Sequence, residues 1–118
     1  MFEQLILPLV QDRTVSLTAD YADASYRKHK YEFDDIDIVL LEGIFLFRPR
    51  YRDHFELRVW VDCSFERALK RAIARGQEGL TRAETSKAFE MIYFPAQRIH
   101  LVRDKPRDHA DLLLDNEG

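Results

Sequence analysis

The feature that most limits how this chain can fold is a nearly unbroken apolar run from Ile36 to Phe47, which begins IDIVLLEGIF. A strand with one face in water alternates apolar and polar residues, whereas this run is apolar at consecutive positions. Such runs are typical of strands that are covered on both faces, as in parallel sheets. The run therefore predicts a buried strand in a parallel β-sheet.

Two shorter apolar runs predict further strands. One covers Leu57–Val61 and ends at Asp62, and the other covers Ala110–Leu114 and ends at Asp115. Helical patterns lie between them, and strands that alternate with helices define an α/β fold. We expect a three-layer, partly parallel sheet with flanking helices in a single domain over residues 1–118, because a chain of this length fits one core.

The region between these two runs carries two helix signals. Ser64 can cap a helix that Gly76 stops, and Thr81 with Glu84 forms a capping box for a second helix. Helical spacing predicts these inward side chains: Phe65, Leu69, Ala72 and Ile73 in the first helix, and Ala88, Met91 and Ile92 in the second. The second helix is expected to bend or restart at Pro95.

The N-terminal third is less regular. Phe2–Val10 is expected to form a short helix that ends within Pro8–Asp12. Residues 14–34 are rich in tyrosine, aspartate and lysine, which favours a loop-like excursion. Short strands are expected there at Val15–Leu17 and Tyr31–Phe33.

Composition and charge exclude several classes of protein. The net charge of −3 provides no global basic field for nucleic acid or an anionic membrane. The basic cluster of Arg48, Arg50 and Arg52 is interpreted as a solvated loop, so no nucleic-acid partner is expected. No apolar stretch approaches the roughly 18 residues of a membrane helix. The single cysteine, Cys63, lies in no CxxC pair and cannot form an intramolecular disulfide, which favours a cytoplasmic location.

Counting residues also excludes common catalytic motifs. The four glycines stand at positions 43, 76, 79 and 118, and none precedes a lysine, so the sequence holds neither GxxxxGK[ST] nor GxGxxG. The histidines at 29, 54, 100 and 109 lack the spacing of a zinc site, and no GxSxG motif is present.

One candidate functional residue is Glu42, which interrupts the apolar run. A buried carboxylate needs a cation or hydrogen-bond donors, and the carboxyl edge of a parallel sheet is where α/β proteins bind ligands. Glu42 is therefore a candidate ligand of a hydrated Mg²⁺ ion beside phosphates. The alternative is that Glu42 marks an exposed strand end and Gly43 a turn.

Two further groups of residues suggest a ligand. Arg67, Arg71 and Arg75 recur every fourth residue and share one helix face before a segment flanked by glycines, so they could close over phosphates. The alternative is a solvated arginine face. The second group offers ring faces and donors for a planar ligand such as a nucleobase, or is an ordinary loop: Tyr21, Tyr26, Arg27, His29 and Tyr31.

Six groups of residues, spread over almost the whole chain, carry a resemblance to a known family. In order along the chain they are Asp37–Ile44, Arg52–Leu57, Val59–Asp62, Arg71 with Arg75, Tyr93–Ala96 and Ala110–Leu114. Together they resemble the later part of uridine kinase-like P-loop kinases. Members of this family transfer a phosphoryl group from ATP, with Mg²⁺, to uridine, cytidine or a related small hydroxyl acceptor.

The resemblance implies roles for individual residues. Glu42 would hold the water shell of Mg²⁺, and Arg71 and Arg75 would approach the phosphates of ATP from the lid. The segment around the acceptor pocket would contain Tyr21, Tyr26, Arg27 and His29. Phe2–Leu9 would be helical.

The resemblance also implies what the chain lacks. The phosphate loop and the general base of the family would lie before Met1, so the chain by itself is expected to be inactive. The alternative function is a non-catalytic binding or assembly module on a kinase-derived scaffold. The strand with the phosphate loop would separate the Glu42 strand from the Leu57–Val61 strand. We therefore expect these two strands to pair directly, or a second copy or another partner to complete the sheet.

Overall fold

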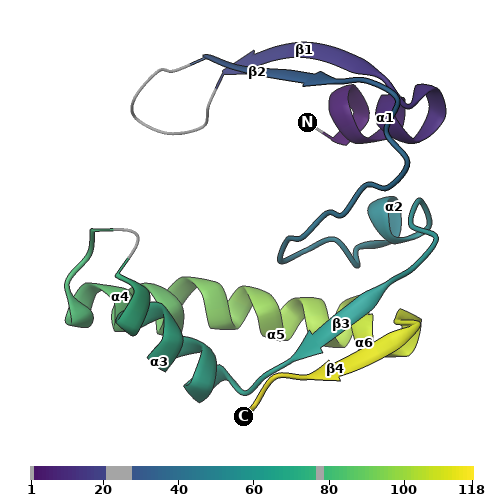
Figure 1. Cartoon of the computed structure of the whole chain (residues 1–118). Coiled ribbons are helices and arrows are strands. Elements are labelled where there is room, and N and C mark those ends of the chain that lie inside the picture. The colour runs from purple at the N-terminus through teal and green to yellow at the C-terminus, as the bar shows by residue number, and fades with distance from the viewer. Residues whose placement is uncertain (1, 21–27, 77–78) are drawn as a thin grey trace. The chain divides into compact units, whose positions relative to one another are not determined.

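The computed structural model describes residues 2–20, 28–76 and 79–118 (Figure 1). They divide into two compact units, Met1–Glu42 and Gly43–Gly118, and each unit is described by itself. The described residues form a mixed α/β structure with two sheets of two strands each. The mixed α/β class is therefore confirmed, and the single domain over residues 1–118 stays a prediction.

The first unit consists of a helix and a β-hairpin. The π-helix η1 (Phe2–Ile6) continues into α1 (Leu7–Asp12), which confirms the predicted helix and its end. Strands β1 (Val15–Asp20) and β2 (Lys28–Phe33) are antiparallel and are longer than the two short strands that we expected.

The core of this unit lies where the helix meets the hairpin. Leu5, Ile6 and Leu9 are buried. Partly buried side chains from the helix, the hairpin and the following segment pack against them: Phe2, Val15, Leu17, Tyr31, Ile36 and Leu41. Arg13 joins the helix end to that segment, because its Nε donates to the Ile36 carbonyl oxygen at 3.0 Å.

The predicted strand over Ile36–Phe47 is wrong. The structure has no strand between residues 34 and 47, and residues 44–47 form turns. The side chains of Ile38 and Leu40 are 84% and 95% exposed, and Glu42 is exposed rather than buried. A strand needs a hydrogen-bonded neighbour, and the strands in the described parts of the chain pair only as β1–β2 and β3–β4. Hydrophobicity alone does not supply that neighbour.

The second unit is built on a parallel strand pair. Strand β3 (Val59–Asp62) pairs with β4 (Leu112–Asp115), with Val59 opposite Leu112. Both strands and their parallel direction were predicted. The predicted direct pairing of β3 with the Ile36–Phe47 run is wrong, because β4 is the only strand that pairs with β3 among the described residues.

Helices connect the two strands of this pair. They are α3 (Phe65–Arg75), α4 (Arg82–Ala88), the π-helix η2 (Phe89–Tyr93), α5 (Phe94–Arg103) and α6 (Pro106–His109), and the short α2 (Pro49–Arg52) precedes β3. The Ser64 side chain accepts from the Arg67 N–H, and Gly76 ends α3 with a left-handed φ of 56°. Thr81 and Glu84 form both hydrogen bonds of the capping box. These caps confirm the predicted helix boundaries.

The predicted inward face of the second helix is wrong at two positions. Met91 and Ile92 are 67% and 62% exposed, whereas Thr85 and Phe94 are buried. The cause is η2, because a π-helix has more residues per turn than an α-helix and shifts the positions that follow. The inward face predicted for α3 is confirmed, with Ala72 buried and its three partners half-buried.

A buried polar cluster lies at the end of α5. His100 Nδ1 lies 2.7 Å from Asp104 Oδ2, and the side chains of both residues are at most 4% exposed. Arg52 donates from Nη1 to the Asp104 carbonyl oxygen at 3.0 Å and is only 17% exposed. The interpretation of this arginine as part of a solvated loop is therefore wrong. The His100 ring also contacts the rings of Phe45 and Trp60.

Candidate functional site

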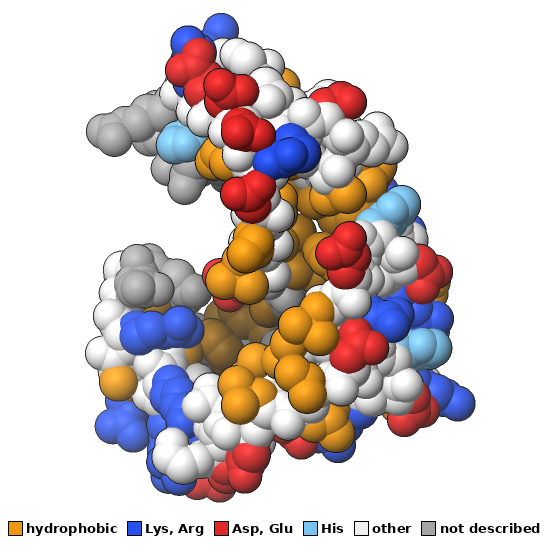
Figure 2. Space-filling view, turned by 45° about the vertical axis from the view of Figure 1, so that its right-hand side comes forward, with side chains coloured by type: hydrophobic (Ala, Val, Ile, Leu, Met, Phe, Trp, Pro, Cys, Tyr) orange, Lys and Arg blue, Asp and Glu red, His pale blue; other side chains and the backbone are white. Residues whose placement is uncertain are grey.

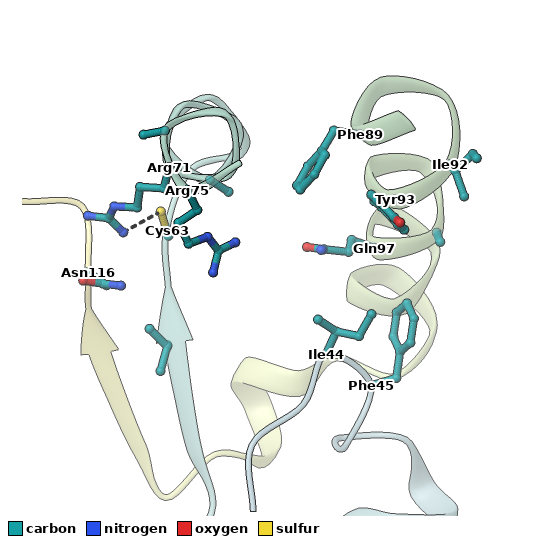
Figure 3. Close-up of a pocket in the computed structure, with 14 residues that line it drawn as sticks. Ile44, Phe45, Cys63, Arg71, Arg75, Phe89, Ile92, Tyr93, Gln97 and Asn116 are labelled. Atoms are coloured by element: carbon teal, nitrogen blue, oxygen red, sulfur yellow. Dashed lines mark hydrogen bonds between the residues drawn. The ribbon is translucent and has the colours of Figure 1, made fainter. Parts of the chain in front are cut away.

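The second unit contains a cavity of about 1150 Å³ (Figure 3). Its walls are mainly apolar, with a few polar groups. The lining residues come from the segment before α2, from β3, α3, η2 and α5, and from the residues directly after β3 and β4: Ile44, Phe45, Val61, Cys63, Ala68, Arg71, Ala74, Arg75, Phe89, Ile92, Tyr93, Ala96, Gln97 and Asn116.

The strand pair fixes where this cavity lies. Cys63 follows β3 and Asn116 follows β4, and parallel strands bring their carboxyl ends to the same edge of a sheet. Ligands of open α/β sheets bind at that edge. The cavity lies at the carboxyl edge of the β3–β4 pair, whereas the sequence placed a ligand at the end of a strand carrying Glu42, which the structure does not contain.

Arg71 and Arg75 form one polar wall. Their spacing of four residues places both on the same face of α3. Arg71 donates from Nη1 to Cys63 Sγ at 3.5 Å and from Nη2 to the Gly118 carbonyl oxygen at 3.0 Å, so it is held at the strand ends. In Figure 3 the Arg75 side chain extends toward η2 and α5. Arg67, the third arginine of this face, does not line the cavity.

The Glu117 carboxylate links the segments that follow β3 and β4. Glu117 accepts from the Ser64 N–H and hydroxyl at 2.7 Å each. These two hydrogen bonds hold the pKa of Glu117 below its ordinary value, with smaller contributions from Arg67 and Arg71.

Arg75 differs from Arg71 in its partners. Within the described part of the chain, the Arg75 side chain forms no hydrogen bond or ion pair. Arg75 is therefore the cation best placed to bind an anionic ligand.

The opposite wall is aromatic with one amide. Phe89, Tyr93 and Gln97 follow one another every fourth residue, and the Phe89 and Tyr93 rings meet edge to face at 5.0 Å between centroids. Our sequence reasoning did not select Phe89, Gln97, Cys63 or Asn116. The repeat at every fourth position was the signal that could have identified the first two.

The buried polar cluster supports the floor of the cavity. The Phe45 ring lies edge-on to His100 at 5.4 Å between centroids, and the Arg48 guanidinium lies 4.7 Å from the centre of the Phe45 ring. Hydrogen bonds from Arg103 are the main reason that the pKa of Asp104 falls to about 2, and the hydrogen bond with His100 lowers it further. The spacing of His100 and Asp104, four residues apart on a helix, could have identified this pair from the sequence.

The remaining predicted site residues lie in the first unit or outside the described residues. Glu42 is exposed, and no group of three or more His, Cys, Asp or Glu side chains that could hold a metal gathers among residues 2–20, 28–76 and 79–118. His29 lies on β2 with its ring 4.5 Å from that of Tyr31. Tyr21, Tyr26 and Arg27 fall outside the described residues.

Comparison with known proteins gives no assignment, because no family model and no curated protein matches the chain. In the described residues, no helix is both long enough and apolar enough to cross a membrane. The functional proposal therefore depends on the chemistry of the cavity and on the residues that line it.

Proposed function

We propose that this chain carries the arginine-bearing part of a uridine kinase-like, ATP-dependent phosphotransferase that acts on a nucleoside or a similar small hydroxyl acceptor. The observation that supports it best is the pair Arg71 and Arg75 in a cavity at the carboxyl ends of two parallel strands. Guanidinium groups bind phosphate oxygens through charge-assisted hydrogen bonds. The three-layer, incomplete P-loop kinase-like fold is part of this proposal.

The cavity offers groups for each part of a nucleoside phosphate. Arg75 provides the cation for phosphate, Phe89 and Tyr93 offer ring faces for a base, and Gln97 and Asn116 offer amide groups for its polar edge. Sites for small molecules combine apolar walls with a few polar groups in this way. His29 and the other predicted acceptor residues remain part of the proposal.

Mg²⁺ and ATP are the proposed cofactors. Mg²⁺ is commonly bound through one or two carboxylates together with substrate phosphates, and the kinase resemblance assigns that carboxylate to Glu42. Bound Mg²⁺ would offset negative charge on the phosphates of ATP. Glu42 would contribute one oxygen to the hydrated ion.

We propose further that the chain transfers no phosphate by itself. Phosphoryl transfer depends on positioning and charge stabilisation, and the sequence has no GxxxxGK[ST] loop to cradle the phosphates. The same observation favours the second candidate function, a non-catalytic binding or assembly module that retains the cavity. The two candidates differ in whether a polypeptide with a phosphate loop restores transfer to this chain.

Calorimetric titration with ATP, with and without Mg²⁺, and separately with uridine tests the proposal. We expect Arg75→Gln to weaken ATP binding by about 10- to 100-fold, the range for one hydrogen bond to a charged group. The matched control is Arg67→Gln, which changes an exposed arginine of the same helix outside the cavity. Equal losses in both variants, or no binding of ATP by the wild-type chain, would contradict the proposed site.

A further inference from the structure

The cavity of the second unit has an apolar end that a nucleoside phosphate leaves unused. Ile44 and Phe45 lie at this end, apart from the labelled arginines in Figure 3. Val61 of β3 also lines the cavity. None of these three side chains can donate or accept a hydrogen bond, so they gain only from contact with an apolar group. A ligand that fills the cavity therefore has an apolar part.

The aliphatic side chains of this cavity are open to a ligand. Ile44, Val61 and Ile92 are 62%, 49% and 62% exposed. Figure 2 shows hydrophobic side chains exposed on the second unit, with Lys and Arg side chains on the same face. A cavity of about 1150 Å³ exceeds the roughly 300–1,000 Å³ of typical small-molecule sites. It therefore has room for a hydrocarbon group beside a group that carries phosphate.

The cation in the same cavity determines the charge of the ligand. Arg75 has no hydrogen-bond or ion-pair partner among residues 2–20, 28–76 and 79–118, and Arg71 lies on the same face of α3. An uncharged apolar ligand would leave the Arg75 guanidinium without a partner, and inorganic phosphate would leave the apolar end in water. A ligand that joins an anionic head to an apolar body satisfies both parts of the cavity.

We propose that the cavity binds the phosphate ester of an alcohol with a hydrocarbon body, with the phosphate at Arg75 and the body along Ile44, Phe45 and Val61. The ligand class rests on the proposed function, which assigns Arg75 to phosphate and leaves the acceptor open between a nucleoside and another hydroxyl compound. The apolar end favours the second kind of acceptor.

The phosphate ester is the product that phosphoryl transfer to such an alcohol would form. The alcohol oxygen bonds to the γ-phosphorus of ATP while the bond from that phosphorus to the bridging oxygen breaks. ADP leaves, and the hydroxyl proton goes to solvent. Because the ester contains both the phosphate and the hydrocarbon body, its binding tests the ligand class without requiring transfer by this chain.

The length of the hydrocarbon body should determine the affinity in regular steps. Each methylene group that moves from water to an apolar wall strengthens binding by about 4-fold. The increase ends when the body fills the apolar end of the cavity. A hydrocarbon chain that stays in water outside the cavity adds nothing to the affinity.

Calorimetric titration of the full chain with ethyl, butyl, hexyl and octyl phosphate, each below the concentration at which it forms micelles, tests this proposal. We expect the affinity to rise by about 4-fold per methylene group along the series. Arg75→Gln should weaken the binding of octyl phosphate by about 10- to 100-fold, because it removes the charged partner of the phosphate. Arg67→Gln, outside the cavity, should leave it unchanged.

A second pair of variants tests the apolar end. Ile44→Gln should weaken the binding of octyl phosphate by about 10-fold and leave that of ethyl phosphate unchanged, because only the longer chain reaches this side chain. Unchanged binding of ethyl phosphate also shows that the variant is folded. The matched control is Ile99→Gln, which changes an isoleucine of α5 that is 59% exposed and does not line the cavity. It should leave the binding of both esters unchanged.

Three results would each overturn the proposed ligand: no binding of octyl phosphate by the wild-type chain, affinities that do not depend on chain length, or equal responses to Ile44→Gln and Ile99→Gln. The proposed function has a separate readout. ATP binding that depends on Arg75, together with a flat alkyl series, would overturn the ligand class alone. A chain-length effect without ATP binding would support the ligand class and contradict the proposed function.

Discussion

Replacing Asp104 by asparagine tests the buried polar cluster below the cavity. The Asp104 carboxylate accepts from Arg103 at 3.0 Å and lies 2.7 Å from His100 Nδ1, and its side chain is 4% exposed. These partners lower the pKa of Asp104 from 3.8 to about 2. Asparagine keeps the shape of the side chain and removes the charge.

The magnitude follows from the pKa difference. A folded-state pKa nearly two units below the unfolded value corresponds to roughly 2 kcal/mol of stability near neutral pH. Arg103 is 58% exposed, and solvent screening reduces this contribution, so we expect Asp104→Asn to lower the free energy of unfolding by about 1–2 kcal/mol. Because the folded pKa is depressed, the contribution is present above about pH 4 and is lost as the pH falls through 2.

Urea unfolding followed by the fluorescence of Trp60, the single tryptophan, measures this difference in stability. Trp60 is a suitable reporter because its ring lies 6.3 Å from the His100 ring. We expect the difference between wild type and Asp104→Asn to shrink by about 1 kcal/mol between pH 6 and pH 3. The control Asp108→Asn, at an exposed position on α6, should change stability by less than about 0.5 kcal/mol. A difference that stays constant with pH would refute the reasoning.

Two further predictions concern helix boundaries. Thr81→Ala removes one hydrogen bond of the capping box and should lower stability by about 1 kcal/mol in urea unfolding, whereas an unchanged midpoint would show that the cap contributes nothing. Gly76→Ala places a Cβ at a φ of 56° and should lower the free energy of unfolding by about 1 kcal/mol. The loss comes from backbone strain alone, because a Cβ there would meet no atom within 4 Å. A variant that is more stable than wild type in thermal unfolding would contradict this.

Local signals in the sequence were sufficient for much of the secondary structure. The Ser64 cap, the Thr81 and Glu84 box and the Gly76 stop are formed by residues within a few positions of one another. The β3 and β4 strands were also predicted, from their apolar runs, and each has the other as its hydrogen-bonded neighbour. Spacing alone placed Arg71 and Arg75 on one helix face, and both line the cavity.

The π-turn at η2 shows where periodicity fails. An α-helical pattern assigns Met91 and Ile92 to the inner face, but one wider turn rotates the positions that follow. Helical or strand spacing also could not show that Arg52 is half-buried and donates to a carbonyl oxygen fifty-two residues further along the chain.

The sequence by itself determined the helix caps, the two parallel strands and the arginine spacing, because each depends on interactions between near neighbours or on a simple period. Only the tertiary structure decided whether the Ile36–Phe47 run forms a strand. Its hydrophobicity indicates that the run favours burial, but a strand forms only where another strand offers free backbone groups. Among the described residues no strand pairs with this run, and Ile38 and Leu40 stay exposed.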